Sequence, residues 1–121
     1  MIATPLRFFV LALPFVVAHM MAMRYFLYFY VPWFDTLMHT WGGFLTIMGF
    51  VMLGSIGSRR LALTRPLMLL GLLAVMVAWE VFEYVYGIAG THPSYLVDTA
   101  LDVVAGATGG LVAFVVFRRL V

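Results

Sequence analysis

Residues 66–89 read PLMLLGLLAVMVAWEVFEYVYGIA, a run whose only charged members are Glu80 and Glu83. A hydrocarbon core about 30 Å thick is crossed by roughly 20 apolar residues in an α-helix, so the run is long enough to cross a membrane. Pro66 suits the first turn of such a helix, and Gly87 suits its exit. This segment therefore predicts a transmembrane helix that carries two carboxylates near one end.

Three further runs of the same kind lie on either side of it. Together the four runs predict spans at about 6–31, 33–57, 66–89 and 95–117. The chain of 121 residues is 65% hydrophobic and 10% charged, a balance typical of membrane proteins rather than of soluble domains. The sequence predicts a single all-α domain, a polytopic bundle of four transmembrane helices in the lipid bilayer.

The arginines predict which way the bundle faces. Six of the seven cationic side chains precede the first span, lie between the second and third, or follow the fourth: Arg7, Arg59, Arg60, Arg65, Arg118 and Arg119. Short arginine-bearing segments stay in the cytoplasm, so we expect an N-in, C-in topology with the loops near 32 and 90–94 outside. Topology and anionic lipid explain these arginines, and no nucleic-acid partner is predicted.

The carboxylates form pairs at helical spacing. With one histidine they give three pairs at i,i+4 or i,i+3: Asp35 with His39, Glu80 with Glu83, and Asp98 with Asp102. Each pair lies on one helix face. The first and third pairs open helices that descend from outside, and the second closes a helix that rises from inside. All three pairs should therefore meet at the outer side of the membrane.

The depth of each group follows from the helical rise of about 1.5 Å per residue. A deeper tier of His39, Glu80 and Asp102 would lie roughly 9–11 Å below the outer boundary. A shallower tier, about 3–5 Å deep, is formed by the remaining acids. Its members are Asp35, Glu83 and Asp98.

Five carboxylates in a partly dehydrated site repel one another and need cations, protons or dense hydrogen bonding. The chain has no cysteine, so metal ligands would be oxygen and imidazole. Such pairs on facing helices build dinuclear carboxylate sites, and the ligand types permit one or two ions of zinc, manganese or iron. The sequence predicts a divalent-metal site formed by Asp35, His39, Glu80, Glu83, Asp98 and Asp102. The alternative is a buried polar network that fixes helix packing, with the shallow aspartates favoured by the helix dipole.

Three other polar residues could support this site. Arg24 could supply a countercharge, or bind an anionic head group. His19 could add an imidazole near the deeper tier, although a lone interior histidine is more often structural. His92, in the outer loop, could reach over the site or be a plain loop residue. We therefore expect supporting rather than primary roles for these three.

Glycines mark faces where helices can approach closely. Gly106 and Gly110 form a small-xxx-small pair, and the second span carries Gly42, Gly43 and Gly49. Small residues let backbones approach where lipid gives no hydrophobic driving force. Close helix packing is the predicted role of these positions.

The ordered polar motifs carry a resemblance that spans residues 33–112. Asp35-xxx-His39-xxx-Gly43, Glu80-xx-Glu83, and Asp98-xxx-Asp102 with its following glycines resemble the small inner-membrane YjdF-type family of unknown function. The resemblance to VanZ-like glycopeptide-resistance membrane proteins is looser, because Thr36 stands where that pattern has Lys and carboxylates replace its amides. The resemblance to the YjdF-type family implies a location in the bacterial inner membrane. It also agrees with the predicted four-helix fold and with the predicted metal site.

Three functions fit these features, and whether the chain is an enzyme is left open. The first is a membrane metalloenzyme in which a carboxylate serves as general base toward an amphiphilic or lipid-linked substrate. The second is cation or proton transport, which the absence of ionisable residues in the inner halves of the helices disfavours in a monomer. The third is an accessory or assembly subunit, in a homo-oligomer or a larger membrane complex, whose glycine faces dock partners.

Overall fold

The structure is a computed structural model and describes residues 5–55, 64–88 and 94–117. Its helices, in chain order, are α1 Pro5–Tyr25, α2 Leu27–Tyr30, α3 Phe34–Ser55, α4 Arg65–Tyr86 and α5 Tyr95–Phe117. These ranges contain no strand. The predicted all-α class is confirmed.

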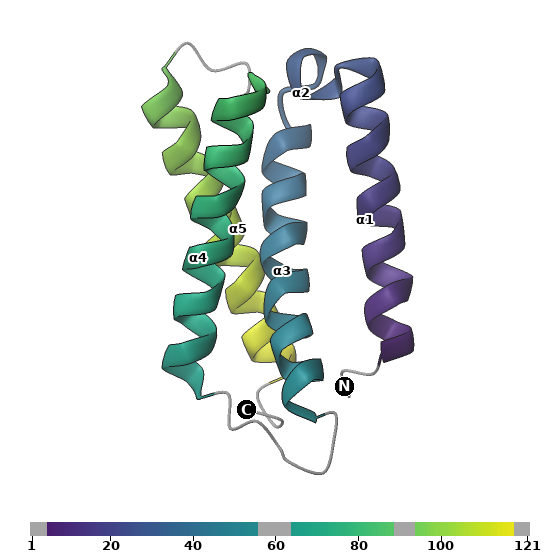
Figure 1. Ribbon diagram of the computed structural model, residues 1–121, viewed down its shortest axis with the longest axis vertical. Coiled ribbons are helices and arrows are strands. Elements are labelled where there is room, and N and C mark those ends of the chain that lie inside the picture. The colour runs from purple at the N-terminus through teal and green to yellow at the C-terminus, as the bar shows by residue number, and fades with distance from the viewer. Residues whose placement is uncertain (1–4, 56–63, 89–93, 118–121) are drawn as a thin grey trace.

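Four of the helices, α1, α3, α4 and α5, are long and apolar enough to cross a membrane. They run side by side along the long axis, and α2 sits at one end of the bundle, which we call the α2 end (Figure 1). This confirms the predicted bundle of four candidate spans. The N-in, C-in orientation remains a prediction.

The first span is shorter than the sequence predicted. Phe26 adopts a left-handed backbone with φ 56°, which is uncommon for a residue other than glycine. It ends α1 at Tyr25, and the short α2 follows. A continuous span to residue 31 was therefore wrong, because the run stays apolar through the break and its composition gives no sign of it.

The helix α4 also ends before the predicted limit of residue 89. Gly87 takes a left-handed conformation with φ 64°, and its N–H bonds the carbonyls of Glu83 and Tyr84. Glycine adopts this conformation without steric cost, so it is the usual residue at such a helix end. The result is a sharp stop that fixes the last turn, which carries Glu83, at the α2 end.

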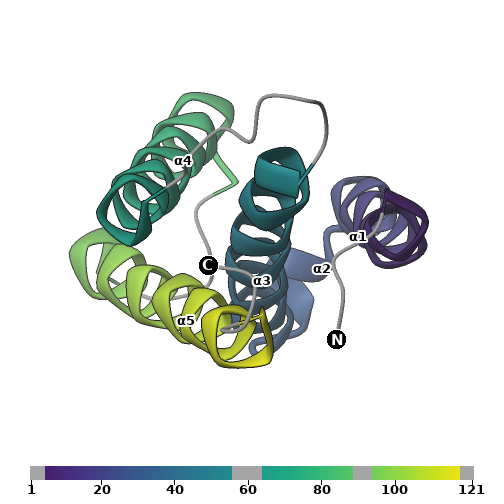
Figure 2. The same ribbon diagram turned by 90° about the horizontal axis from the view of Figure 1, so that it is seen from below.

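The central helix is α3, which packs against α1, α4 and α5 (Figure 2). Its closest partner is α5. A Cβ added at Gly43 would overlap the carbonyl oxygen of Gly106, and one at Gly109 would overlap that of Thr40. The glycines thus allow direct backbone contact, as the sequence predicted.

An apolar core fills the end of the bundle away from α2. It is formed by α3, α4 and α5 and comprises Ile47, Met48, Val51, Met68, Leu72, Met76, Ala113 and Phe117. A smaller cluster of Ala22, Tyr28 and Met38 attaches α1 and α2 to α3. The backbone of α1 lies close to α2 and α3, and α1 meets α4 through ring contacts of His19. The polar site therefore lies in the unit formed by α3, α4 and α5, and α1 packs against another face of α3.

Candidate metal centre

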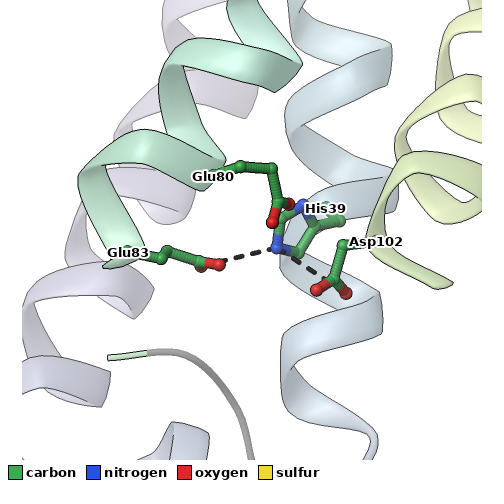
Figure 3. A group of neighbouring side chains, drawn as sticks. All are labelled: His39, Glu80, Glu83 and Asp102. Atoms are coloured by element: carbon green, nitrogen blue, oxygen red, sulfur yellow. Dashed lines mark ion pairs between the residues drawn. The ribbon is translucent and has the colours of Figure 1, made fainter. Parts of the chain in front are cut away.

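Four polar side chains from three helices meet near the α2 end of this unit. His39 from α3, Glu80 and Glu83 from α4 and Asp102 from α5 each offer a ligand atom, and these atoms all lie within 4.8 Å of one another (Figure 3). Their exposed fractions are 8%, 8%, 2% and 3%. Ionisable groups this deeply buried require a partner or a countercharge.

The acids occupy the same helix faces as the apolar core. The buried residues of α4 follow one stripe that ends with the two glutamates: Met68, Leu72, Met76, Glu80 and Glu83. In α5 the buried stripe begins at Asp102 and continues through Ala105 to Phe117. Residues three and four apart share a helix face, so each stripe points its carboxylates toward α3.

The His39 imidazole lies among three carboxylates. Its Nε2 atom is 3.4 Å from Asp35 Oδ1, 3.5 Å from Glu83 Oε1 and 3.7 Å from Asp102 Oδ1. Nε2 is buried and makes no hydrogen bond in the described structure, and one N–H could point to only one of the three oxygens. The nitrogen therefore faces three acceptors, with which it can form ion pairs when the imidazole is protonated (Figure 3).

These separations match those expected around a metal ion. Bond lengths of about 2.0–2.2 Å place two ligand atoms of a tetrahedral site about 3.3–3.6 Å apart. The distances from His39 Nε2 to the Asp35 and Glu83 oxygens, 3.4 and 3.5 Å, lie within that range, and the distance to Asp102 lies just above it. The donor set of one imidazole and several carboxylates fits zinc, manganese or iron.

A second carboxylate group adjoins the first. Ligand oxygens of Asp35, Asp98 and Asp102 also lie within 4.8 Å of one another. Asp102 belongs to both groups: its Oδ1 faces His39, and its Oδ2 is buried without a hydrogen-bond partner in the described structure. Asp102 is thus the residue that the two groups share, and its carboxylate could contribute to both.

The two ligand groups correct the predicted depth of one residue, Glu83. Glu83 lies with His39, Glu80 and Asp102, although its backbone position placed it in the shallower tier. Side chains in a helix tilt toward its N-terminus, and α4 begins at the end opposite α2. The long Glu83 side chain therefore reaches back to the deeper group, which backbone rise alone does not show.

Aromatic side chains hold the cluster from the α1 side. Trp79 Nε1 donates a 2.7 Å hydrogen bond to Glu83 Oε1, the oxygen that faces His39. The His19 ring packs edge-on against Trp79 at 5.1 Å, and His19 Nδ1 lies 2.8 Å from the Tyr28 hydroxyl. Burial raises the pKa of Tyr28, and the nearby carboxylates add to the shift. The phenol therefore stays protonated and able to donate.

A family model described as predicted membrane protein (DUF2238) matches residues 2–121. The chain belongs to this family. No curated protein and no solved structure matches the sequence. Membership confirms the predicted placement in a small membrane-protein family of unknown function, whereas the looser VanZ-like resemblance stays a prediction.

Two of the three supporting residues, Arg24 and His19, stand apart from the carboxylate groups in this DUF2238 protein. Arg24 is exposed, and its guanidinium lies 5.7 Å from the ring centroid of Tyr25, so it is no buried countercharge. His19 belongs to neither ligand group and contacts the site through Trp79. His92 lies outside the described residues.

Two residues that position this cluster were not singled out from the sequence. Trp79 stands four residues before Glu83, so the i,i+4 spacing was an available signal for their hydrogen bond. Tyr28 gave no local signal, because it reaches His19 only through the break at Phe26. Contacts that depend on an irregular turn are not readable from helical periodicity.

Proposed function

We propose that this protein is a membrane metalloenzyme whose divalent ion is bound by His39, Glu80, Glu83 and Asp102, and that it acts on an amphiphilic or lipid-linked substrate. The observation that carries the proposal is the buried His39 Nε2, which faces three carboxylate oxygens at 3.4–3.7 Å without a hydrogen bond. Three carboxylates in ion-pair range of one imidazole leave at least two negative charges that a single protonated histidine would not balance.

Charge balance supports an ion, because a protonated His39 would offset only one of the five acids. All five acids of the chain lie in the two groups, while the arginines of the described ranges, Arg7, Arg24 and Arg65, are all exposed. Like charges close together in a dehydrated site cannot all remain ionised without compensation. A divalent cation supplies two positive charges where no buried arginine does.

A second ion is favoured by the unpartnered Asp102 Oδ2 and by the adjoining Asp35 and Asp98. We expect Asp98→Asn to lower the bound metal from two ions to one per chain, because it removes a charged ligand from the second group only. Elemental analysis of the purified protein measures this ratio. One ion in both the wild type and the variant would show that the second group does not bind metal.

The chemistry assigns separate roles to the residues of the site. A bound divalent ion would supply Lewis acidity and activation of water. The most deeply buried acids, Glu83 and Asp102, hold fixed positions, whereas Asp98 is only half-buried. With a single ion bound, Asp98 would not be a ligand, and it would then be the carboxylate best placed to exchange protons with solvent as a general base. Glu83 is held in place by the Trp79 indole, in the manner of outer-shell partners in metal sites.

The function is tested in two steps with the purified protein. Zinc, manganese or iron should be retained at stoichiometric level, and proteoliposomes made from a bacterial total lipid extract should show a metal-dependent change in lipid species by mass spectrometry. Chelator-treated protein is the control. Absence of metal, together with no thermal stabilisation by any of the three ions, would overturn the metal site. Stoichiometric metal without lipid turnover would overturn the enzyme assignment alone.

We further propose that the α2 end faces outward and that both termini are cytoplasmic, in a bacterial inner membrane, as the arginines predict. Thr64 and Ser94 lie just before α4 and α5, at opposite ends of the bundle, and the chain has no cysteine. A membrane-impermeant maleimide should label Ser94→Cys in intact cells and Thr64→Cys only after permeabilisation. The reverse pattern would invert the topology.

The other two functions are disfavoured or secondary. Within the described helices, no ionisable side chain lies between the carboxylate groups and Arg7 or Arg65, so a path for protons or cations through the monomer is missing. An accessory subunit would need docking faces, yet Gly43, Gly106 and Gly109 face other helices of the same chain. The metalloenzyme remains the function that the site supports best.

A further inference from the structure

A cavity of about 330 Å³ lies between α1, α3 and α4. Its wall is almost entirely apolar, with Ala12 and Phe15 from α1, Met38 from α3 and Met76 from α4. Thr46 also lines it, but its hydroxyl donates to the Gly42 carbonyl and so offers no free donor. The volume is at the lower end of the range for ligand pockets, about 300–1,000 Å³. The space suits a slender apolar ligand.

The cavity opens sideways rather than toward the α2 end. Val16 of α1 and Val75 of α4 line it and are 48% and 46% exposed, whereas Met38 is 2% exposed. The valines therefore mark an open side and the methionine a closed back. The backbones of α1 and α4 are not packed together, but His19 bridges them through the Trp79 ring. This ring contact lies toward the α2 end and closes that side of the cavity. A ligand would therefore enter the cavity from the hydrocarbon region, between α1 and α4.

The cavity and the carboxylate cluster share one side chain. His39 lines the cavity and also belongs to the first ligand group. Trp79 lines the cavity too, and its indole donates to Glu83. The remaining wall runs along α1 to Phe8, so the apolar space extends from the polar site toward the opposite end of the bundle. A ligand that filled it would have an apolar body and a polar group beside His39.

We propose that this cavity binds one acyl chain of a membrane glycerolipid, with the lipid's polar backbone at the carboxylate–histidine cluster. The inference rests on the proposed function and defines its substrate as a bilayer lipid that enters laterally. An apolar chain is favoured because polar ligands would lose hydrogen bonds to water without replacement. The volume is too small for several chains, and the sideways opening lies within segments that cross the hydrocarbon layer. Water-soluble substrates are thereby excluded from this route.

The test is photolabelling of the whole protein in proteoliposomes. The probe is phosphatidylethanolamine with a diazirine in one acyl chain, and the labelled residues are mapped by mass spectrometry. Labels are expected on Met38 and Met76 at the back of the cavity. Ala12→Phe, which fills the cavity, should reduce these labels about tenfold or more. Leu13→Phe is the matched control, because this neighbouring residue is 66% exposed and does not line the cavity.

A second blocking variant distinguishes a blocked cavity from a misfolded protein. Val16→Trp adds bulk at the open side, where the helix surface is exposed, and should reduce the same labels without overpacking the interior. Unchanged labelling of Met38 and Met76 in both blocking variants would overturn the proposal. Loss of labelling to excess polyprenyl phosphate, but not to excess unlabelled phosphatidylethanolamine, would also overturn it.

Metal analysis of the same samples separates this inference from the proposed function. Bound metal in Ala12→Phe, together with lost labelling, supports both ideas. Metal in the wild type without cavity labelling would overturn the acyl-chain site and leave the metal centre standing. Cavity labelling without metal would overturn the metal centre and leave a lipid site.

Discussion

Asp102→Asn is expected to be more stable than the wild type without metal and less stable than the wild type with metal. Without metal, the variant should melt above the wild type, because it removes one of five acids that crowd the same end of the bundle. With metal it should melt below the wild type, because the ion loses a ligand shared by both groups. The change is nearly isosteric, so packing contributes little to either effect.

The expected stabilisation by metal differs enough between the wild type and the variant to be measured. A metal present at about 1,000 times its Kd stabilises the folded state by about 4 kcal/mol. Loss of an outer-shell partner already costs about 10–100-fold in metal affinity, so loss of a direct ligand should cost about 100-fold or more. At the same metal concentration the variant should therefore gain at most about 1.4 kcal/mol, roughly a third of the stabilisation of the wild type.

Both predictions are tested by thermal unfolding in mild detergent. The melting temperature is measured with added zinc, manganese or iron, and again with chelator. Thr108→Val is the control, since this exposed residue of the same helix bonds only its own helix through the Val104 carbonyl. It should keep the full response to metal. If Asp102→Asn melted below the wild type under both conditions, Asp102 would instead be a member of a structural hydrogen-bond network.

Much of this site follows from spacing and span order alone. The pairs Asp35 with His39 and Asp98 with Asp102 open descending helices, and Glu80 with Glu83 closes a rising one, so their meeting at one end is dictated by topology. Membrane spans make the reasoning reliable, because the helix axes must lie nearly parallel and residue number then converts into depth. The structure brings together the same residues that this arithmetic selected.

Other features depend on side-chain direction or on irregular backbone. The depth of Glu83 required the tilt of its side chain along α4, and the end of α1 required the left-handed Phe26. Neither feature can be recognised from the hydropathy of the sequence. The cavity beside Phe15 arises because the backbone of α1 packs on α3, whereas α1 meets α4 through ring contacts of His19. Since α1 is almost wholly apolar around its surface, periodicity could not show which side it presents to the bundle.

Gly43→Ala is expected to unfold or strongly destabilise the bundle, while Gly42→Ala is expected to be nearly neutral. A Cβ at Gly43 would overlap the carbonyl of Gly106, a backbone atom that cannot move without shifting α5. A Cβ at Gly42 would meet only the Phe15 ring, at 3.6 Å, an ordinary contact. Overpacking costs about 1–3 kcal/mol and sometimes more, and a rigid backbone neighbour places Gly43→Ala at the upper end.

The same substitution should weaken metal binding. Gly43 lies one turn beyond His39, and Gly106 lies one turn beyond Asp102, so the glycine contact sets the separation of α3 and α5 beside the site. Forcing the helices apart would move the Asp102 carboxylate away from His39 Nε2, now 3.7 Å distant. Unfolding and metal titration of both alanine variants measure the two effects. A Gly43→Ala protein that folds and binds metal like Gly42→Ala would show that the close approach of α3 and α5 is not what assembles the site.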